Sequence, residues 1–227
     1  MKNVLITGAS GGIGYELVQL FLEANHNVMA VSRNTKELAK IKNEKLWIVE
    51  ADITTDKGRK QIKEQVKKGG ELCILINNAG ALVNKPFAKI TDKELRDVYE
   101  ANVFAPFQLL QQLIPLMGKT QRAHVVNIGS MGGYQGSAKF SGLTAYSSSK
   151  FAIAGLTEIL AEEFKDKNIA FNCLAIGAAQ TKMLAKAFPG YKAPVSATQM
   201  AEFIMDFSLH SHNYINGKII PVSLSTP

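Results

Sequence analysis

A tyrosine and a lysine stand four residues apart in the segment YSSSK, at Tyr146 and Lys150. On a helix this spacing places the phenol and the ammonium on one face, one turn apart. A phenol has a pKa of about 10, and a nearby positive charge lowers that pKa toward neutrality. The pair therefore predicts acid–base chemistry. In a lysine-rich chain the same spacing also fits an amphipathic helix with a solvated lysine.

A glycine-rich turn, TGASGGIG at residues 7–14, lies between an apolar run at 4–6 and an amphipathic run at 13–22. Glycines at 8, 12 and 14 let the backbone N–H groups at a helix N-terminus approach a phosphate closely. The spacing is GxxxGxG rather than the commoner GxGxxG. The turn predicts phosphate binding, and a plain tight turn before a surface helix is the alternative.

The elements that must position these groups alternate along the chain. Apolar runs predict strands, and amphipathic runs between them predict helices. We expect strands at 4–6, 27–32, 46–50, 72–76, 123–128, 169–176 and 218–222, and helices at 13–22, 35–41, 56–68, 92–117, 146–164 and 196–208. This alternation predicts an α/β fold, a doubly wound domain whose seven-stranded, mainly parallel sheet is flanked by helices.

Polar or glycine residues follow the end of each of six predicted strands. In a doubly wound sheet the ligand binds beyond the carboxyl ends of the strands, so these positions converge on one edge. They are Gly8, Arg33, Asp52, Asn77, Ser130 and Gly177. The convergence predicts a single site built from distant parts of the chain.

The composition narrows the class of protein. With 227 residues and 46% apolar content, the chain can form one domain over 1–227, and no run approaches the length of a membrane helix. The short apolar run near the N-terminus leaves no room for a signal peptide, so we expect a cytoplasmic protein.

Cys73 and Cys173 fall in predicted buried strands, which indicates core residues and neither a disulfide nor a metal site.

The net charge of +7 raises the question of nucleic-acid binding. The richest basic segment, between Arg33 and Lys68, alternates lysines with Glu64, Ile62 and Val66. That pattern is typical of the solvated face of an amphipathic helix, and no nucleic-acid motif accompanies it. We therefore expect no nucleic-acid partner.

Five segments, in order, resemble the short-chain dehydrogenase/reductase family, which has an NAD(P)-binding Rossmann-type fold. They are TGASGGIG, NNAG at 77–80, an asparagine at 102 in a long helix, the strand end Ile128-Gly129-Ser130, and YSSSK. The likeness covers essentially the whole chain. Each motif is weak alone, but their order is specific.

The resemblance implies four catalytic residues. Tyr146 would be the acid or base that exchanges a proton with the substrate oxygen, and Ser130 would donate a hydrogen bond that orients it. Lys150 would bind the nicotinamide ribose and tune Tyr146, and Asn102 would anchor a proton-relay water. As alternatives, Ser130 fits a loop cap and Asn102 fits a hydrogen bond at a helix bend.

A nicotinamide cofactor follows from the same resemblance, and the residues favour NADP(H) over NAD(H). An NAD site usually has an acid at the end of the second strand, whereas this chain has Ser32 and Arg33, which suit a 2′-phosphate. A surface arginine is the alternative, and the glycine turn lacks the basic residue of some NADP-preferring relatives. The expected cofactor-binding residues are Gly8, Ser10, Gly12, Ile13, Gly14, Ser32, Arg33, Asp52, Ile53, Asn78, Ala79, Gly80, Tyr146, Lys150, Gly177 and Thr181.

The sequence departs from the family pattern in three places. Ile176 stands where a proline is usual, and the loop from Met131 to Ala145 is long, with Tyr134 and Phe140 as pocket-lining or loop-packing side chains. The substrate lid at 181–196 is short and apolar. Its Leu184, Phe188, Pro189 and Tyr191 suit an apolar carbonyl substrate.

The predicted helices at 92–117 and 146–164 are apolar on more than one face, so we expect a homodimer or homotetramer built through them. The function we expect is an NADP(H)-dependent oxidoreductase that transfers a hydride between the nicotinamide and a carbonyl or secondary alcohol, as a ketone or aldehyde reductase. Two alternatives stay open: a 3-oxoacyl thioester reductase, which a basic surface suits because carrier proteins are acidic, and a non-catalytic NADP-binding sensor or scaffold.

Overall fold

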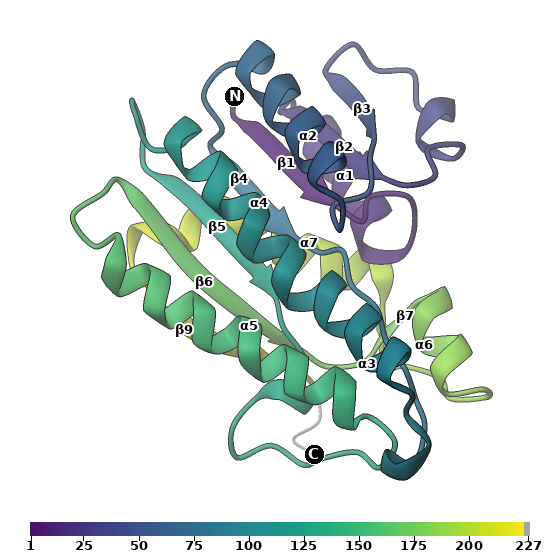
Figure 1. Cartoon of the computed structure of the whole chain (residues 1–227). Helices are drawn as coiled ribbons and strands as arrows, with labels where there is room; N and C mark the ends of the chain where they lie inside the picture. The colour runs from purple at the N-terminus through teal and green to yellow at the C-terminus, as the bar shows by residue number, and fades with distance from the viewer. Residues whose placement is uncertain (225–227) are drawn as a thin grey trace.

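A computed structural model describes residues 1–224 of the chain, and its centre is one parallel sheet (Figure 1). The strand order is β3-β2-β1-β4-β5-β6-β9, and every neighbouring pair is parallel. The predicted seven-stranded doubly wound sheet is therefore confirmed. The strands are β1 (Asn3–Thr7), β2 (Asn27–Ser32), β3 (Leu46–Glu50), β4 (Ile74–Asn77), β5 (Ala123–Ile128), β6 (Ile169–Ile176) and β9 (Lys218–Val222).

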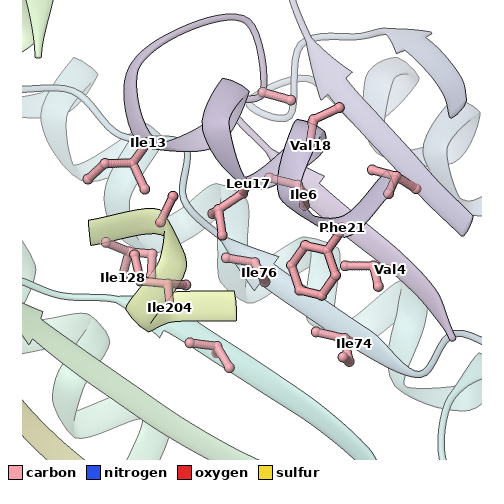
Figure 2. Packing of buried hydrophobic residues seen from close by; sticks show 14 of the residues in the cluster. Val4, Ile6, Ile13, Leu17, Val18, Phe21, Ile74, Ile76, Ile128 and Ile204 are labelled. Carbon is pink, nitrogen blue, oxygen red and sulfur yellow. The ribbon is translucent and has the colours of Figure 1, made fainter. Parts of the chain in front are cut away.

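Helices cover both faces of this sheet. On one face α1 (Gly12–Glu23) and α7 (Ala197–His210) pack together, and Figure 2 shows Leu17 and Phe21 of α1 beside Ile204 of α7 over the strands. On the other face lie α2 (Asp56–Gly69), α4 (Ala105–Leu113) and α5 (Thr144–Glu163), visible in front of the sheet in Figure 1. Because both faces are buried, the central strands read as continuous apolar runs.

The predicted helix at 92–117 is not one helix. It consists of α3 (Asp92–Tyr99), a π-helical turn, η3 (Glu100–Phe104), then α4 and a 3-10 turn at Ile114–Leu116. Pro106 lies at the start of α4 and has no N–H to donate to the carbonyl of Asn102, so a regular α-helix is interrupted here. Apolar spacing alone does not reveal this break.

Two other predicted elements, the helix at 35–41 and the strand at 72–76, also differ from the structure. The expected helix at 35–41 is only a 3-10 turn at Leu38–Lys40, anchored by the buried Leu38. The strand expected from residue 72 begins at Ile74, because Leu72 forms only an isolated bridge with Met117. Cys73 therefore precedes the strand, although both cysteines are buried and free as expected.

Residues 179–196, which include the segment predicted to be a lid, contain secondary structure that the apolar pattern did not indicate. A short helix, α6 (Lys182–Ala187), is flanked by β7 (Ala179–Gln180) and β8 (Val195–Ser196), which pair as a two-stranded sheet. The pairing joins the two ends of the segment to each other. Within residues 1–224 no helix is long and apolar enough to span a membrane.

Candidate active site

A cleft of about 600 Å³ opens along the carboxyl ends of the strands. It is lined by the glycine turn, the ends of β4, β5 and β6, the start of α5 and the lid. Sequence segments far apart therefore meet here, as the strand-end pattern predicted. The predicted site residues that line the cleft are Gly8, Gly12, Ile13, Asn78, Ala79, Gly80, Ser130, Tyr146, Lys150, Gly177 and Thr181.

The glycine turn is packed too closely for side chains at two of its glycines. Gly8 has φ +68°, and a Cβ there would lie 2.8 Å from the Cα of Ala79. A Cβ on Gly14 would lie 2.3 Å from the carbonyl oxygen of Gly8. The turn leads into α1, whose N-cap Gly11 makes no side-chain cap, so the first N–H groups of the helix are available to an anion. This geometry fits a dinucleotide diphosphate.

Thr7 and Asn78 fasten the glycine turn to the end of β4. The Thr7 hydroxyl accepts from the backbone N–H groups of Asn78 and Ala79, each at 3.1 Å. The Asn78 side chain donates to the carbonyls of Thr7, at 3.0 Å, and Gly8, at 3.2 Å. Asn78 thus holds the turn in shape, and its contact with Thr7, about 70 residues away, is not visible in any sequence motif.

Ser130, Tyr146 and Lys150 lie together at the other end of the cleft. Ser130 follows β5, and its hydroxyl is within hydrogen-bonding reach of the Tyr146 hydroxyl. The Lys150 ammonium donates to the carbonyl of Ile128 at 2.7 Å and lies 5.7 Å from the centre of the Tyr146 ring. A proton donor, a hydroxyl that can orient a substrate oxygen and a fixed cation therefore share one site.

Burial dominates the acid–base properties of this cluster. It raises the pKa of Tyr146, and the Ser130 hydrogen bond opposes that rise only in part. Burial also lowers the pKa of Lys150 to about 8. In the structure, the Lys150 ammonium donates to the Ile128 carbonyl, and burial keeps the pKa of Tyr146 above its usual value. The predicted lowering of this pKa by Lys150 together with an oxidised nicotinamide stays a prediction.

Asn102 lies behind the cleft, in the π-helical turn. Its side-chain oxygen accepts from the N–H of Ala81 at 2.8 Å, and its amide nitrogen donates to the Ala81 carbonyl and the Ser149 hydroxyl, both at 2.9 Å. Ser149 in turn donates to the Tyr146 carbonyl at 2.6 Å. The predicted asparagine therefore connects the loop after β4 to the first turn of α5.

The residues expected near the adenosine lie next to the glycine turn, beyond the lining of the cleft. Two backbone hydrogen bonds hold these segments together. The N–H of Ala9 donates to the Val31 carbonyl at 3.1 Å, and the N–H of Ala51 donates to the Ser32 carbonyl at 3.0 Å. Arg33 follows directly after Ser32 and is exposed. The predicted residues outside the lining are Ser10, Gly14, Ser32, Arg33, Asp52, Ile53 and Asn102.

Asp52 is held in its ionised form. Burial alone would raise its pKa, but hydrogen bonds from the Thr54 backbone N–H, at 2.9 Å, and the Thr54 hydroxyl, at 2.7 Å, outweigh burial. The charge of Arg33 acts in the same direction, so the pKa of Asp52 lies below its usual value. Arg33 and Asp52 are thus close enough to interact.

The predicted nicotinamide-side residues lie where β6 meets the lid. Ile176, in place of the usual proline, is the last residue of β6 and pairs with Val222. Gly177 donates its N–H to the Val222 carbonyl at 2.8 Å. Thr181 caps α6 by accepting from the Leu184 N–H at 3.2 Å. The isoleucine therefore continues the sheet up to the cleft.

The far side of the cleft is apolar. Phe140 lines it, whereas Tyr134 is absent from the lining, which separates the two loop aromatics that the sequence left undecided. Sequence reasoning missed Leu82, Leu143 and Lys182, because only their neighbours belong to recognisable motifs. The apolar side chains that line this end are Leu82, Met131, Phe140, Leu143, Met183, Leu184, Phe188 and Tyr191.

Comparison with known proteins gives a consistent family. Residues 2–192 match the family model described as short chain dehydrogenase. An uncharacterized oxidoreductase of Escherichia coli, YciK, is 30% identical over 199 residues, covering 83% of this chain and 77% of that protein. The 3-oxoacyl-[acyl-carrier-protein] reductase FabG of Thermotoga maritima is 28% identical and covers 97% of this chain and 96% of its own length.

A solved structure supports the same fold. RhlG of Pseudomonas aeruginosa in complex with NADP superposes with a TM-score of 0.86 at 26% identity, over 98% of this chain and 94% of that one. Other structures with this fold contain NADH. These neighbours share a nicotinamide cofactor, but only NADP, and not NADH, carries a 2′-phosphate.

Proposed function

We propose, from the premise that the chain belongs to the short-chain dehydrogenase family, that it is an NADP(H)-dependent reductase of ketones or aldehydes. Membership makes the protein an oxidoreductase that acts on CH–OH and C=O groups. The observation that carries the proposal is one cleft with a phosphate-binding turn at one end and Ser130, Tyr146 and Lys150 beside apolar side chains at the other.

The residues that line the cleft, together with those beside the glycine turn that lie outside the lining, suit each part of a dinucleotide. The glycine turn would hold the diphosphate, Ser32 and Arg33 the 2′-phosphate, and Lys150 the nicotinamide ribose. Asp52 and Ile53 would flank the adenine. When bound, the nicotinamide supplies or accepts the hydride. The preference for NADP(H) rests on Arg33, because an arginine pairs with a phosphate and no acid occupies its place.

Tyr146 would donate its proton to the carbonyl oxygen of the substrate. Its raised pKa keeps it protonated near neutral pH, which suits the reductive direction. Ser130 would orient the same oxygen by donating a hydrogen bond. The nearby Lys150 cation would stabilise the phenolate that remains after proton transfer.

Asn102 would contribute to a proton relay through its carbonyl rather than its side chain. Both amide hydrogens and the side-chain oxygen are already bonded to Ala81 and Ser149. The carbonyl lacks its α-helical donor because residue 106 is a proline. A relay water would donate a hydrogen bond to this carbonyl of Asn102.

A 3-oxoacyl thioester reductase is the second candidate. The Thermotoga maritima relative is named for that activity. An apolar cleft suits an acyl chain, and the net charge of +7 suits an acidic carrier. For either substrate we propose that residues 181–196 act as the lid, since their apolar side chains close one side of the cleft.

The test is to mix the purified protein with NADPH and a panel of ketones, aldehydes and 3-oxoacyl thioesters and to follow the loss of NADPH absorbance. We expect turnover by the wild type. Tyr146→Phe removes only the hydroxyl, so it should lower turnover by roughly two orders of magnitude or more while NADPH still binds. Full activity in Tyr146→Phe would contradict the mechanism.

We also propose that the protein is a homodimer or homotetramer, assembled through the segment 92–117, which holds α3, η3 and α4, and through the helix expected at 146–164, which is α5. Large apolar side chains remain exposed on this side of the chain, among them Phe104, Phe107 and Phe151. A partner would bury them. The cytoplasmic location expected from the sequence stays a prediction.

A further inference from the structure

Lys182 is the first residue of α6 and lines the cleft next to Thr181. Among the described residues that line the cleft, the only charged side chains are Lys150 and Lys182, and none is acidic. The lining therefore favours a negatively charged ligand. Lys150 lies at the Tyr146 end, where it donates to Ile128, so the charge of Lys182 serves another part of the cleft.

The start of α6 lies against the start of α1. Gly12 is the first residue of α1, and a Cβ on it would be 3.2 Å from Cγ2 of Thr181. Lys182 follows directly, so its backbone stands across from the N–H groups of the glycine turn. The first turn of α1 carries no acidic side chain that would compete for the lysine.

The Lys182 ammonium is unpaired in the described part of the chain. Within residues 1–224 it forms neither an ion pair nor a hydrogen bond. Glu37, in the loop after β2, is bonded to Lys40 at 2.7 Å. That bond is the main cause of the lowered pKa of Glu37, and the charge of Lys182 adds to it. Lys182 thus lies within electrostatic range of the loop that carries Arg33, on the cofactor side of the lid.

We propose that Lys182 binds the diphosphate of the nicotinamide dinucleotide from the lid side. This inference rests on the proposed function and assigns one more residue to its cofactor. The glycine turn, TGASGGIG, has no basic side chain, so it offers the diphosphate backbone N–H groups and hydroxyls but no positive charge. Lys182 supplies the missing positive charge and links cofactor binding to the position of α6.

The primary test measures the dissociation constants of NADPH and NADH by fluorescence titration. Lys182→Met should weaken the binding of both nucleotides by roughly tenfold, because both carry the diphosphate. Lys182→Arg should restore binding. Lys186→Met is the matched control, since Lys186 lies on the same helix and is absent from the lining, and it should bind as the wild type does.

A second readout follows the lid directly. At saturating NADPH we expect trypsin cleavage after Lys186 and Lys192 to slow in the wild type, and to slow less in Lys182→Met. This measurement requires no substrate and no turnover.

Three results would overturn the inference. Equal binding by wild type and Lys182→Met would show that the lysine makes no contact with the cofactor. Loss confined to NADPH would assign Lys182 to the 2′-phosphate instead of the diphosphate. If the wild type bound neither nucleotide, the proposed function itself would fail, which separates that failure from the failure of Lys182 alone.

Discussion

At the scale of single side chains, Arg33 is the residue that we propose to bind the 2′-phosphate of NADP(H). Arg33 is exposed at the end of β2 and close enough to Asp52 to lower the pKa of that carboxyl. Asp52 is a neighbouring anion of its guanidinium, which donates no hydrogen bond to residues 1–224 and so keeps its N–H donors available. A phosphate at this point would use them.

We expect Arg33→Ser to weaken NADPH binding by roughly tenfold or more, because one charge-assisted contact is lost. NADH binding should change little, since NADH has no 2′-phosphate. Lys36→Ser is the control, because Lys36 is also exposed and lies three residues along the same loop. Titration of both nucleotides measures the change, and equal loss for NADPH and NADH would argue against the assignment.

At the scale of elements, the π-helical turn and the first turn of α5 act as one unit. Asn102 donates to Ser149, and Ser149 donates to the Tyr146 carbonyl. Ser149 is fully buried, so this chain of hydrogen bonds is shielded from water. The position of Tyr146 therefore depends on an element more than 40 residues away in sequence.

We expect Ser149→Ala to lower the free energy of unfolding by roughly 1–3 kcal/mol, because the Asn102 amide loses a buried acceptor. The value of kcat should fall while the dissociation constant of NADPH stays unchanged, since the hydroxyl positions Tyr146 and does not line the cleft. Ser148→Ala is the control, because Ser148 bonds only to the Ala145 carbonyl of its own helix. Chemical unfolding and steady-state kinetics measure both effects. An unchanged kcat would contradict the positioning role.

At the scale of the whole molecule, two features depend on the assembled fold: the exposed aromatic face and a buried histidine. Phe104 and Phe107 are 49% and 44% exposed. We expect the wild type to sediment as a dimer or larger, and Phe107→Glu to sediment as a monomer, because a carboxylate in an apolar interface is strongly unfavourable. Phe87→Glu is the control, because Phe87 is 76% exposed and lies in the 3-10 turn at Phe87–Lys89, outside the proposed interface. A monomeric wild type would refute the interface.

His124 makes stability depend on pH. Its Nε2 accepts from Asn172, since an amide nitrogen only donates, so its Nδ1 carries the proton that is donated to the Ser208 carbonyl, each at 3.0 Å. Burial lowers the pKa of His124 from 6.5 to about 3. The neutral ring thus ties β5 to β6 and α7.

Above pH 6.5 both folded and unfolded states hold His124 neutral, and its full contribution is present. Between pH 6.5 and about 3 only the unfolded state takes up the proton, so stability falls as pH falls, by up to about 1.4 kcal/mol per pH unit. Urea unfolding at several pH values measures this slope. In His124→Gln we expect the dependence of the unfolding free energy on pH to lose the contribution of one proton. An unchanged slope would contradict the burial of a neutral ring.

The sequence alone determined the elements whose signals are local. Strands at 27–32, 46–50, 123–128, 169–176 and 218–222 match the structure residue for residue. Apolar periodicity records which face of a segment is buried, and glycines with φ near +60° mark turns that other residues avoid. The strand-end rule then located the cleft, since parallel strands bring their carboxyl ends to one edge.

Only the tertiary structure decided what depends on distances between segments far apart in sequence. The break at Asn102 reflects Pro106 together with contacts to Ala81 and Ser149, and the raised pKa of Tyr146 reflects burial that no local pattern records. Lys182 lines the cleft because the start of α6 packs against the start of α1. Motifs identify residues with intrinsic chemistry, whereas the approach of one element to another sets their partners, solvation and charge.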